Sequence, residues 1–346
     1  MEFYDSGPSI NNLYFPVKVT RVFIRYFTRM VGYRPSLLTL QCIVKIINKL
    51  EKLFDLSYIS YLFEINIYQL RYRISIFSEG LKSSVKVKNE WAYYTITNSK
   101  SMRVRLNAKS YLSLMSRHGF NDRNSQNNVK SINPSLLKNF SDNKFYLYGP
   151  NVIKPPNKKY SDYTLVVLKP MDYDISQFQK KLLFVNGGYY WAKMANDNDH
   201  CIKLINDYGR VVVSSLSNIK SPLEKAKFPM SGNIAAPMAL GRILYNLIYS
   251  YGRFKCVIEG FDFYLDKTMY SSSYPSLARQ EGLINEQWIC YGLSVHDALY
   301  NFLYVKELCN YLDINDSYNF KGILKMSGDT FLQNLQKVRN FNLLKK

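Results

Sequence analysis

Residues 145–151 read FYLYGPN, a short apolar run that ends in a Gly-Pro turn. Four similar apolar runs follow along the chain, separated by stretches with helical character. Short strands that alternate with helices are typical of an α/β domain with a mainly parallel sheet. The predicted strands are residues 145–148, 163–168, 182–185, 211–213 and 254–258.

Polar and glycine residues stand where these predicted strands end. Gly149 and Asn151 follow the first strand, Asn186 follows the third, and Gly260 comes shortly after the fifth. Ligands of parallel α/β sheets bind at the carboxyl ends of the strands. A Gly-Pro turn lets the backbone approach a ligand there, and an asparagine can bind ribose or phosphate. Taken alone, however, the Gly-Pro-Asn sequence is more often a plain turn.

The 346-residue chain is strongly basic, with a formal net charge of +20. Residues 1–140 carry 21 basic and 8 acidic side chains, and residues 141–346 carry 25 and 18, so most of the excess lies in the first segment. A basic surface fits an anionic partner such as nucleic acid, anionic lipid, or a phosphate-bearing or acidic sugar. Hydrophobic residues make up 47% of the chain, which excludes a disordered protein.

The first segment, residues 1–140, has a basic and mostly helical character and no catalytic motif. In residues 17–31, Arg21, Arg25 and Arg29 recur every four positions opposite an apolar stripe, as in an amphipathic helix. Such a helix either lies on an anionic membrane or packs its stripe on the core, and the second interpretation is slightly favoured. Residues 35–75 also have a helical pattern, residues 80–131 are mixed and polar, and a boundary is predicted near residue 140.

Cysteine usage and the absence of targeting signals indicate where in the cell the protein is expected. An odd, scattered set of cysteines predicts neither a disulfide framework nor a zinc site, and it fits a reducing environment. The N-terminus lacks the basic and apolar regions of a signal peptide, and no apolar run is long enough to span a bilayer. We therefore expect a cytoplasmic protein. The cysteines are Cys42, Cys201, Cys256, Cys290 and Cys309.

Ser231-Gly232-Asn233 stands before a long stretch with helical periodicity. One of these three residues is expected to cap that helix. A helix N-terminus presents free N–H groups and a partial positive charge, which suit a carboxylate or a phosphate. Simple capping explains the motif equally well.

Acidic and tyrosyl side chains follow the fifth predicted strand. Residues 259–264 read EGFDFY and place Asp262 just beyond the strand end, and Tyr270 and Tyr274 come shortly afterwards. Tyrosyl hydroxyls can donate hydrogen bonds to a departing phosphate. The chain contains 30 tyrosines, so any single one is a weak candidate on its own.

His296, in Val295-His296-Asp297, stands directly before an apolar stretch with helical spacing. The other two histidines, His118 and His200, lie in polar, loop-like contexts. A histidine can take a proton from an acceptor hydroxyl near neutral pH. Without its context, a capping or structural histidine is an equally good interpretation.

The order of these motifs resembles the bacterial sialyltransferases and related transferases that use CMP-activated ulosonic acids. The resemblance covers roughly residues 143–315, and GFDFY and the serine-glycine pair are its most specific parts. It implies a Rossmann-like sheet, in a variant of the GT-A-like sialyltransferase fold, over residues 141–346. The chain departs from the family in three respects. The stretch from Ser231 to Gly260 is longer than usual, the Gly-Pro loop lacks a preceding Gly-Asn, and the basic segment before residue 140 has no counterpart in the family.

The resemblance implies a role for each matched position. His296 would be the general base, and Tyr270 and Tyr274 would assist the departing phosphate. The implied reaction is a direct displacement with inversion, from a CMP-linked sialic acid, Kdo or other nonulosonate to a glycan or glycolipid, without metal or cofactor. Contacts with the CMP donor are predicted for Gly149, Pro150, Asn151, Asn186, Ser231, Gly232, Asn233 and Asp262.

The basic first segment also suits an enzyme that acts on lipid-linked, anionic glycans at a membrane. Residues 1–140 are therefore predicted to contact the acceptor, a partner or an anionic membrane, with the protein peripheral on the inner face of the cytoplasmic membrane. Nucleic acid is not the expected partner.

Two other functions are open at this stage. A metal-dependent nucleotide-sugar glycosyltransferase would hold a divalent cation with an Asp-x-Asp pair, because hard cations prefer carboxylate oxygen. Asp197-Asn198-Asp199 and Asp172-Tyr173-Asp174 both fit that pattern, and polar loops are the favoured interpretation of both. A non-enzymatic protein that binds nucleic acid or membrane is the second alternative. The net positive charge favours such a binding protein, but no recognisable nucleic-acid-binding motif is present.

Overall fold

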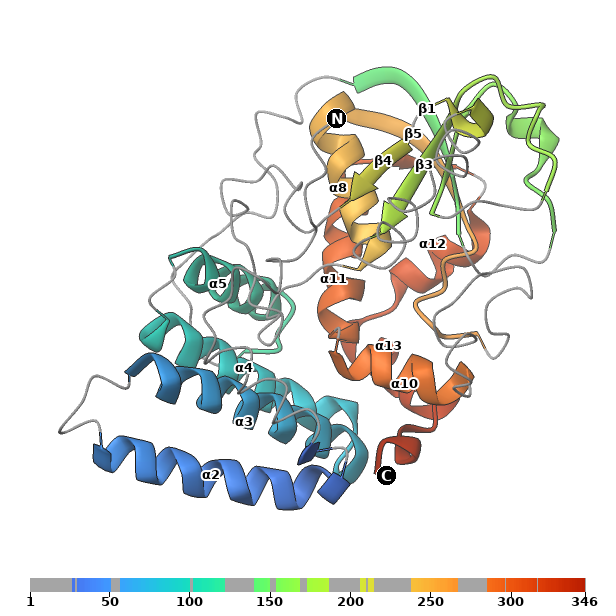
Figure 1. Ribbon diagram of the computed structural model, residues 1–346. Coiled ribbons are helices and arrows are strands. Elements are labelled where there is room, and N and C mark those ends of the chain that lie inside the picture. Colours follow the sequence, from blue (N-terminus) through green and yellow to red (C-terminus); the bar gives the residue numbers. More distant parts are fainter. Residues whose placement is uncertain are drawn as a thin grey trace.

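The computed structural model describes residues 27–28, 30–50, 57–99, 102–121, 140–149, 154–168, 173–186, 206–209, 211–214, 238–266, 285–295, 297–315 and 317–345. These residues form a parallel sheet flanked by helices, together with a layer of helices from the first part of the chain (Figure 1). The predicted α/β architecture is confirmed.

The sheet contains six described strands in the order β4-β3-β2-β1-β5-β6, and every neighbouring pair is parallel. All five predicted strands are present. The sixth was not predicted, because two residues are too short to show a pattern. The strands are β1 (Phe140–Tyr148), β2 (Thr164–Val167), β3 (Lys181–Asn186), β4 (Val211–Ser214), β5 (Arg253–Glu259) and β6 (Asp313–Ile314).

Successive side chains of β1 point to opposite faces of the sheet and therefore belong to two separate hydrophobic cores. Phe145 and Leu147 belong to the main core, which also contains residues of α8 (Ala239–Tyr251) and α11 (Ala298–Cys309). Tyr146 and Tyr148 point to the other face of the sheet. There they join a smaller core with Tyr160 of η3 (Lys158–Tyr160), Ile175 and Phe178.

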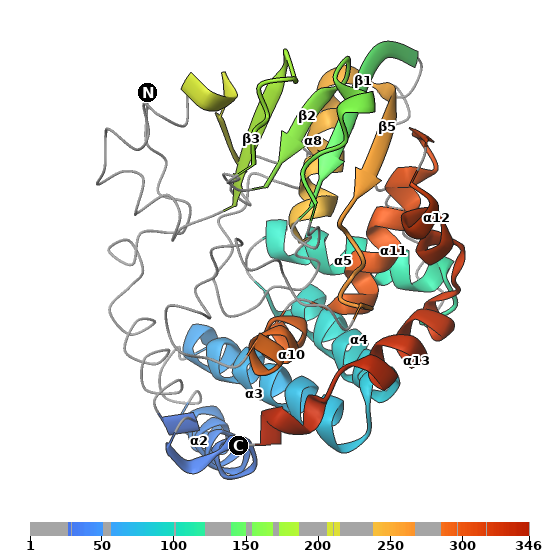
Figure 2. The same cartoon turned by 90° about the vertical axis from the view of Figure 1, so that its right-hand side faces the viewer.

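Helices α2 to α5, described in the first segment, form a layer that faces the carboxyl ends of the strands (Figure 2). The described residues of this segment are mostly helical, as predicted, although α4 and α5 fall where the sequence is mixed and polar. The buried side of α4 carries Ser84, Lys88 and Thr95, and these polar residues weaken its apolar periodicity. The helices are α2 (Tyr33–Leu50), α3 (Ser57–Ser78), α4 (Leu81–Asn98) and α5 (Met102–Arg117).

The helical layer and the sheet share one hydrophobic core. Trp91 and Tyr111, from the first segment, belong to the same buried cluster as Leu240 and Phe302. Helix α5 contacts α11, α4 contacts α13, and α3 contacts both α10 and η4. The boundary predicted near residue 140 coincides with the start of β1, but packing continues across it. The remaining elements are α10 (Asn285–Val295), α12 (Tyr318–Lys325), α13 (Gly328–Val338) and η4 (Phe341–Lys345).

Four of the five cysteines lie in the described part of the chain. The described cysteines Cys42, Cys256, Cys290 and Cys309 are all free thiols. None of the helices in the described part of the chain combines the length and apolar character that crossing a bilayer requires.

A close approach of two glycines joins the central strands where they end. The Gly149 N–H donates to the Glu259 carbonyl at 2.7 Å, which extends the β1–β5 pairing beyond the strands. A Cβ atom at Gly149 would clash with the Gly260 carbonyl group and with the Phe261 ring. Position 149 therefore requires glycine for steric reasons, independently of any ligand.

We predict that Gly149→Ala destabilises the fold by roughly 1–3 kcal/mol, because the new methyl group has to push backbone atoms apart. Gly322→Ala in α12 is the matched control, since a Cβ there meets no atom within 4 Å and alanine favours a helix. Chemical denaturation of both variants measures the difference. Equal stability of the Gly149 variant and the wild type would contradict the packing described here.

Candidate functional site

The sheet reverses its direction of growth between β1 and β5. From β1 the chain adds β2, β3 and β4 on one side, and it then returns to place β5 and β6 on the other side. In open α/β sheets, ligands bind at such a switch point, outside the carboxyl ends of the strands. Tyr148 pairs with Glu259 at this edge, and the β5 end points toward the helical layer (Figure 2).

Tyr146 and Glu259 form a polar contact at the switch point. The Tyr146 hydroxyl donates to the Glu259 carboxylate and accepts the Asn157 backbone N–H at 3.2 Å. Burial, together with the hydrogen bond to Glu259, raises the pKa of Tyr146 above its usual range. The phenol therefore stays protonated and orients Glu259. Sequence reasoning missed Tyr146, because its position in a strand predicts only a core aromatic residue.

The turn after β5 is organised by Asp262. Its carboxylate accepts the backbone N–H groups of Tyr264 and Asp266, both at 2.9 Å. These bonds stabilise the left-handed backbone of Phe263 and Tyr264, whose φ angles are 53° and 65°. The structure thus gives Asp262 a role in shaping the turn, and its predicted contact with the donor stays a prediction.

Phe263 anchors this turn in the core. Its ring lies 5.6 Å from Phe302 of α11, 5.9 Å from Phe320 of α12 and 6.2 Å from Phe331 of α13, measured between ring centroids. The GFDFY sequence is therefore a packing element that fixes the β5 end against three helices.

Arg339 connects the same turn to α10. Its guanidinium donates to the carbonyls of Tyr264, at 2.8 Å, and Asp266, and it pairs with the Glu286 carboxylate at 2.7 Å. Its side chain is only 2% exposed. Arg339 thereby links the turn after β5 to the first turn of α10. Tyr270 and Tyr274 lie between these two elements in the sequence and outside the described residues.

The N-terminus of α11 is held by Asp297. Its carboxylate accepts the Tyr300 N–H at 2.8 Å as the helix N-cap and the Tyr111 hydroxyl of α5 at 3.2 Å. The prediction that His296 stands just before a helix is thus supported by its described neighbour, which caps α11. Tyr111 shows that the first segment contributes directly to this region.

Lys88 of α4 adds a buried cation to the same cluster. It is 0% exposed, and its ammonium lies 4.4 Å from the Trp91 ring centroid and 5.0 Å from that of Tyr72. Burial lowers the pKa of Lys88 to about 8, and the Asp297 carboxylate opposes this shift. Burial and Asp297 also raise the pKa of Tyr72 and of Tyr111 well above the usual range.

Asn301 joins the N-termini of two helices. Its side-chain amide donates to the Asp297 carbonyl at 2.7 Å, and its side-chain oxygen accepts the Met238 backbone N–H. Met238 is the N-cap residue of α8 and makes no capping bond of its own. The described start of α8 is capped at Met238 and not at Ser231, Gly232 or Asn233 as expected. The backbone N–H of Met238 is bonded there by the Asn301 side chain. No sequence signal pointed to this residue.

The predicted site residues fall into two groups. Gly149 and Asp262 lie at the switch point, and Asn186 is the last residue of β3 at the same edge, paired with Ser214. The others lie outside the described residues, so the structure does not place them. These are Pro150, Asn151, Ser231, Gly232, Asn233, Tyr270, Tyr274 and His296.

The described residues contain no cluster of three or more metal-ligating side chains. Of the two Asp-x-Asp sequences, residues 197–199 and Asp172 lie outside the described part. Asp174 uses its carboxylate to accept the Ser176 backbone N–H at 2.9 Å, as in a polar turn.

Comparisons with known proteins leave the family open. No protein-family model matches the chain, and searches of curated proteins and of solved structures returned no match.

We predict that Arg339→Gln destabilises the protein by roughly 3–5 kcal/mol, because it leaves the Glu286 carboxylate and two backbone carbonyls without their buried partner. Lys82→Gln breaks an exposed ion pair with Asp329 and should cost less than about 1 kcal/mol. Urea denaturation compares the two. Similar losses would show that Arg339 does not connect the turn to α10 as described.

The buried Lys88 predicts a pH dependence of stability. Between about pH 8 and pH 10.5, unfolded lysine keeps its proton whereas folded Lys88 loses it. The contribution of Lys88 to the free energy of unfolding should therefore rise with pH in this window, by up to about 3 kcal/mol. The buried thiols of Cys256, Cys290 and Cys309, whose pKa values burial raises, act in the opposite direction and are the same in each variant. Lys88→Met should therefore remove only the Lys88 contribution, so that its stability increases less, or falls more steeply, with pH than that of the wild type.

Lys86→Met, an exposed substitution on the same helix, is the control and should keep the wild-type slope. The measurement is made below about pH 10, because unfolded tyrosines ionise above that pH and stability then falls. Parallel pH profiles for Lys88→Met and the wild type would contradict a buried Lys88.

Proposed function

We propose that this protein is an inverting glycosyltransferase that uses a CMP-activated ulosonic acid. The donor is CMP-sialic acid or a related CMP-ulosonate such as a Kdo or another nonulosonate, and the acceptor is a hydroxyl of a glycan or glycolipid. His296 is the general base. The proposal extends the resemblance of the motifs and joins it to the geometry at the carboxyl edge of the sheet.

The observation that carries the proposal is the Asn301 bridge. It places the N-terminus of α8, which follows Ser231-Gly232-Asn233 in the chain, beside the N-terminus of α11, which follows His296. A transferase needs the anionic donor and the base close together, because positioning accounts for much of its catalysis. The N-terminus of α8, whose first turn contains no acidic residue, suits the anionic donor through its partial positive charge.

Charge near α8 also supports an anionic ligand. Arg242 is the fourth residue of this helix and is only 7% exposed. Burial lowers the pKa of Arg242 to about 10, which leaves it protonated at neutral pH. A cation in this position favours a phosphate or carboxylate nearby.

In the proposed reaction, His296 takes the proton of the acceptor hydroxyl as its oxygen attacks the anomeric carbon of the donor. The bond from that carbon to the CMP phosphate breaks on the opposite side, which inverts the configuration. Tyr270 and Tyr274 donate hydrogen bonds to the departing phosphate. Gly149, Asn151 and Asn186 contact the nucleotide.

A thermal-shift screen tests the donor class. CMP, CMP-sialic acid and CMP-Kdo should raise the melting temperature, whereas UDP- and GDP-sugars should not, since only ligands of the native state stabilise it. A shift with UDP- or GDP-sugars alone would exclude the proposal. Transfer that is lost in EDTA and restored by a divalent cation would favour the metal-dependent alternative.

We predict that His296→Ala lowers kcat by about 10²–10⁴-fold, because the acceptor loses its general base. Thermal stabilisation by CMP should persist, since the base does not hold the nucleotide. His118→Ala, at the end of α5, is the control and should change kcat little. Steady-state release of CMP measures both, and an unchanged kcat in the His296 variant would disprove its role.

A further inference from the structure

The outer side of α2 carries apolar and cationic side chains together. Leu38 and Ile46 are 64% and 58% exposed, and Cys42, between them in the helix, is exposed as well. Residues four apart share one side of a helix, so these three form a row. The α2 sequence contains no acidic residue. We define the α2 outer face as Arg34, Leu38, Cys42, Lys45, Ile46 and Lys49, all of them exposed.

The inner side of α2 already has its partner. Leu40, Val44 and Ile47 pack with residues of α3 in a small core that is separate from the main one. In both views α2 lies at the edge of the molecule farthest from the sheet (Figures 1 and 2). The outer face thus lies on the surface of the described structure and is not needed to hold α2 in place.

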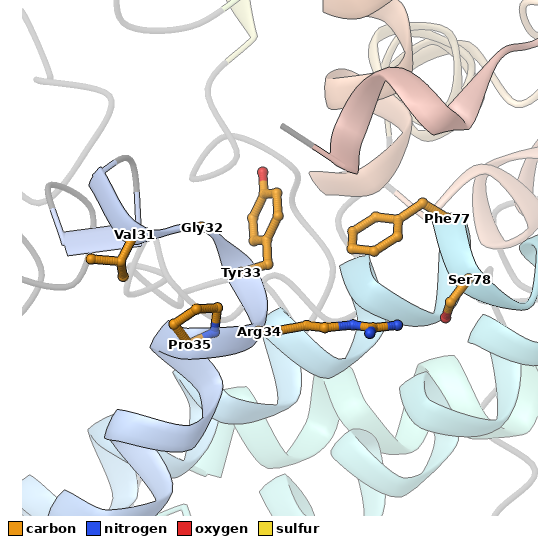
Figure 3. A pocket seen from close by; sticks show the side chains of 7 residues that line it. All are labelled: Val31, Gly32, Tyr33, Arg34, Pro35, Phe77 and Ser78. Atoms are coloured by element: carbon orange, nitrogen blue, oxygen red, sulfur yellow. The ribbon is translucent and has the colours of Figure 1, made fainter.

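A surface hollow of about 560 Å³ continues this face at the start of α2. Val31 and Pro35 give it apolar walls, and Figure 3 shows the Arg34 side chain extending along it toward Ser78. Tyr33 and Phe77, whose ring centroids are 6.0 Å apart, line it as well. Apolar and cationic groups therefore remain mixed along the whole length of the surface.

We propose that the α2 outer face docks the protein on an anionic membrane surface. Arg34, Lys45 and Lys49 attract anionic headgroups, and the aliphatic side chains enter the boundary between headgroups and acyl chains. Both components are needed, because a charged face alone is released by salt and a few aliphatic groups alone bind weakly.

Other occupants fit this surface less well. A nucleic-acid backbone would pair with the cations but would leave Leu38 and Ile46 without an apolar contact. A second copy of the chain, docked through the same face, would bring two sets of three cations together with no carboxylate between them. A lipid surface satisfies both the charge and the apolar side chains. The proposal does not rest on the proposed transferase activity.

Co-sedimentation with lipid vesicles tests the proposal. The wild-type protein should bind vesicles that contain phosphatidylglycerol and not vesicles of phosphatidylcholine alone, and added salt should weaken the binding. Absence of binding to the anionic vesicles, or equal binding to both kinds, would overturn the proposal.

Two double variants separate the two components. Lys45→Gln with Lys49→Gln should weaken the partition coefficient roughly 30-fold, at about 1 kcal/mol per cation near an anionic surface. Leu38→Ser with Ile46→Ser should weaken it about tenfold or more without a change in charge. The matched control is Lys321→Gln with Lys325→Gln, which removes two exposed lysines at the same spacing from α12 and should leave binding unchanged.

Three further outcomes would overturn the assignment of membrane binding to the α2 outer face. Equal loss in the α12 control would mean that net charge alone drives binding, and it would overturn the assignment to α2. So would unchanged vesicle binding by both α2 variants. Sedimentation-velocity data that showed a dimer lost in Leu38→Ser with Ile46→Ser would assign the face to a second copy instead. Circular dichroism confirms that each variant is folded, and these exposed substitutions should leave the fold intact.

Discussion

A buried carboxylate is the constraint on which the arrangement of this molecule depends. Asp297 is almost fully enclosed, and a charge in that position is tolerated only when it is paired and hydrogen-bonded. Its partners come from different parts of the chain: the Tyr300 N–H of its own helix, the Tyr111 hydroxyl of α5 and the electrostatic field of Lys88 on α4. Removing one of the hydrogen-bond donors leaves the carboxylate with fewer partners, and removing Lys88 takes away its nearby positive charge.

This constraint makes the first segment part of the same structural unit as the sheet. The helical layer contains Tyr111 and Lys88, and both lie in the one core that extends across residue 140. The α11 N-terminus that they stabilise is joined through Asn301 to the start of α8. The layer thus shapes the region that the carboxyl ends of the strands face. Its far side, at α2, is exposed on the surface of the described structure.

The sequence predicts the sheet well and the contacts that complete the site poorly. The five strands are apolar runs that end in glycine or polar residues, and a local pattern is enough to find them. Helices α4 and α5 escape such a pattern, because Ser84 and Lys88 occupy the buried side of α4. Ser84 donates to the Leu81 carbonyl of its own helix, and Lys88 interacts electrostatically with Asp297, which lies about two hundred positions later in the chain.

The residues that position the site share this long-range character. Arg339 acts on Tyr264 and Glu286, and Asn301 acts on Met238, so neither belongs to a local motif. GFDFY, in contrast, was recognised from its sequence. The structure gives its Asp262 a role in the turn and its Phe263 a role in the core, because a rigid turn is needed where β5 ends.

We propose that an anionic nucleotide binds at the switch point of the sheet, beside the N-terminus of α8. A crystal structure of the protein with CMP is the decisive test. CMP should lie at the carboxyl ends of β1 and β5, next to Gly149, with its phosphate toward α8. CMP bound elsewhere on the protein, or a crystal soaked to saturation with CMP that shows no nucleotide at this edge, would exclude this binding site.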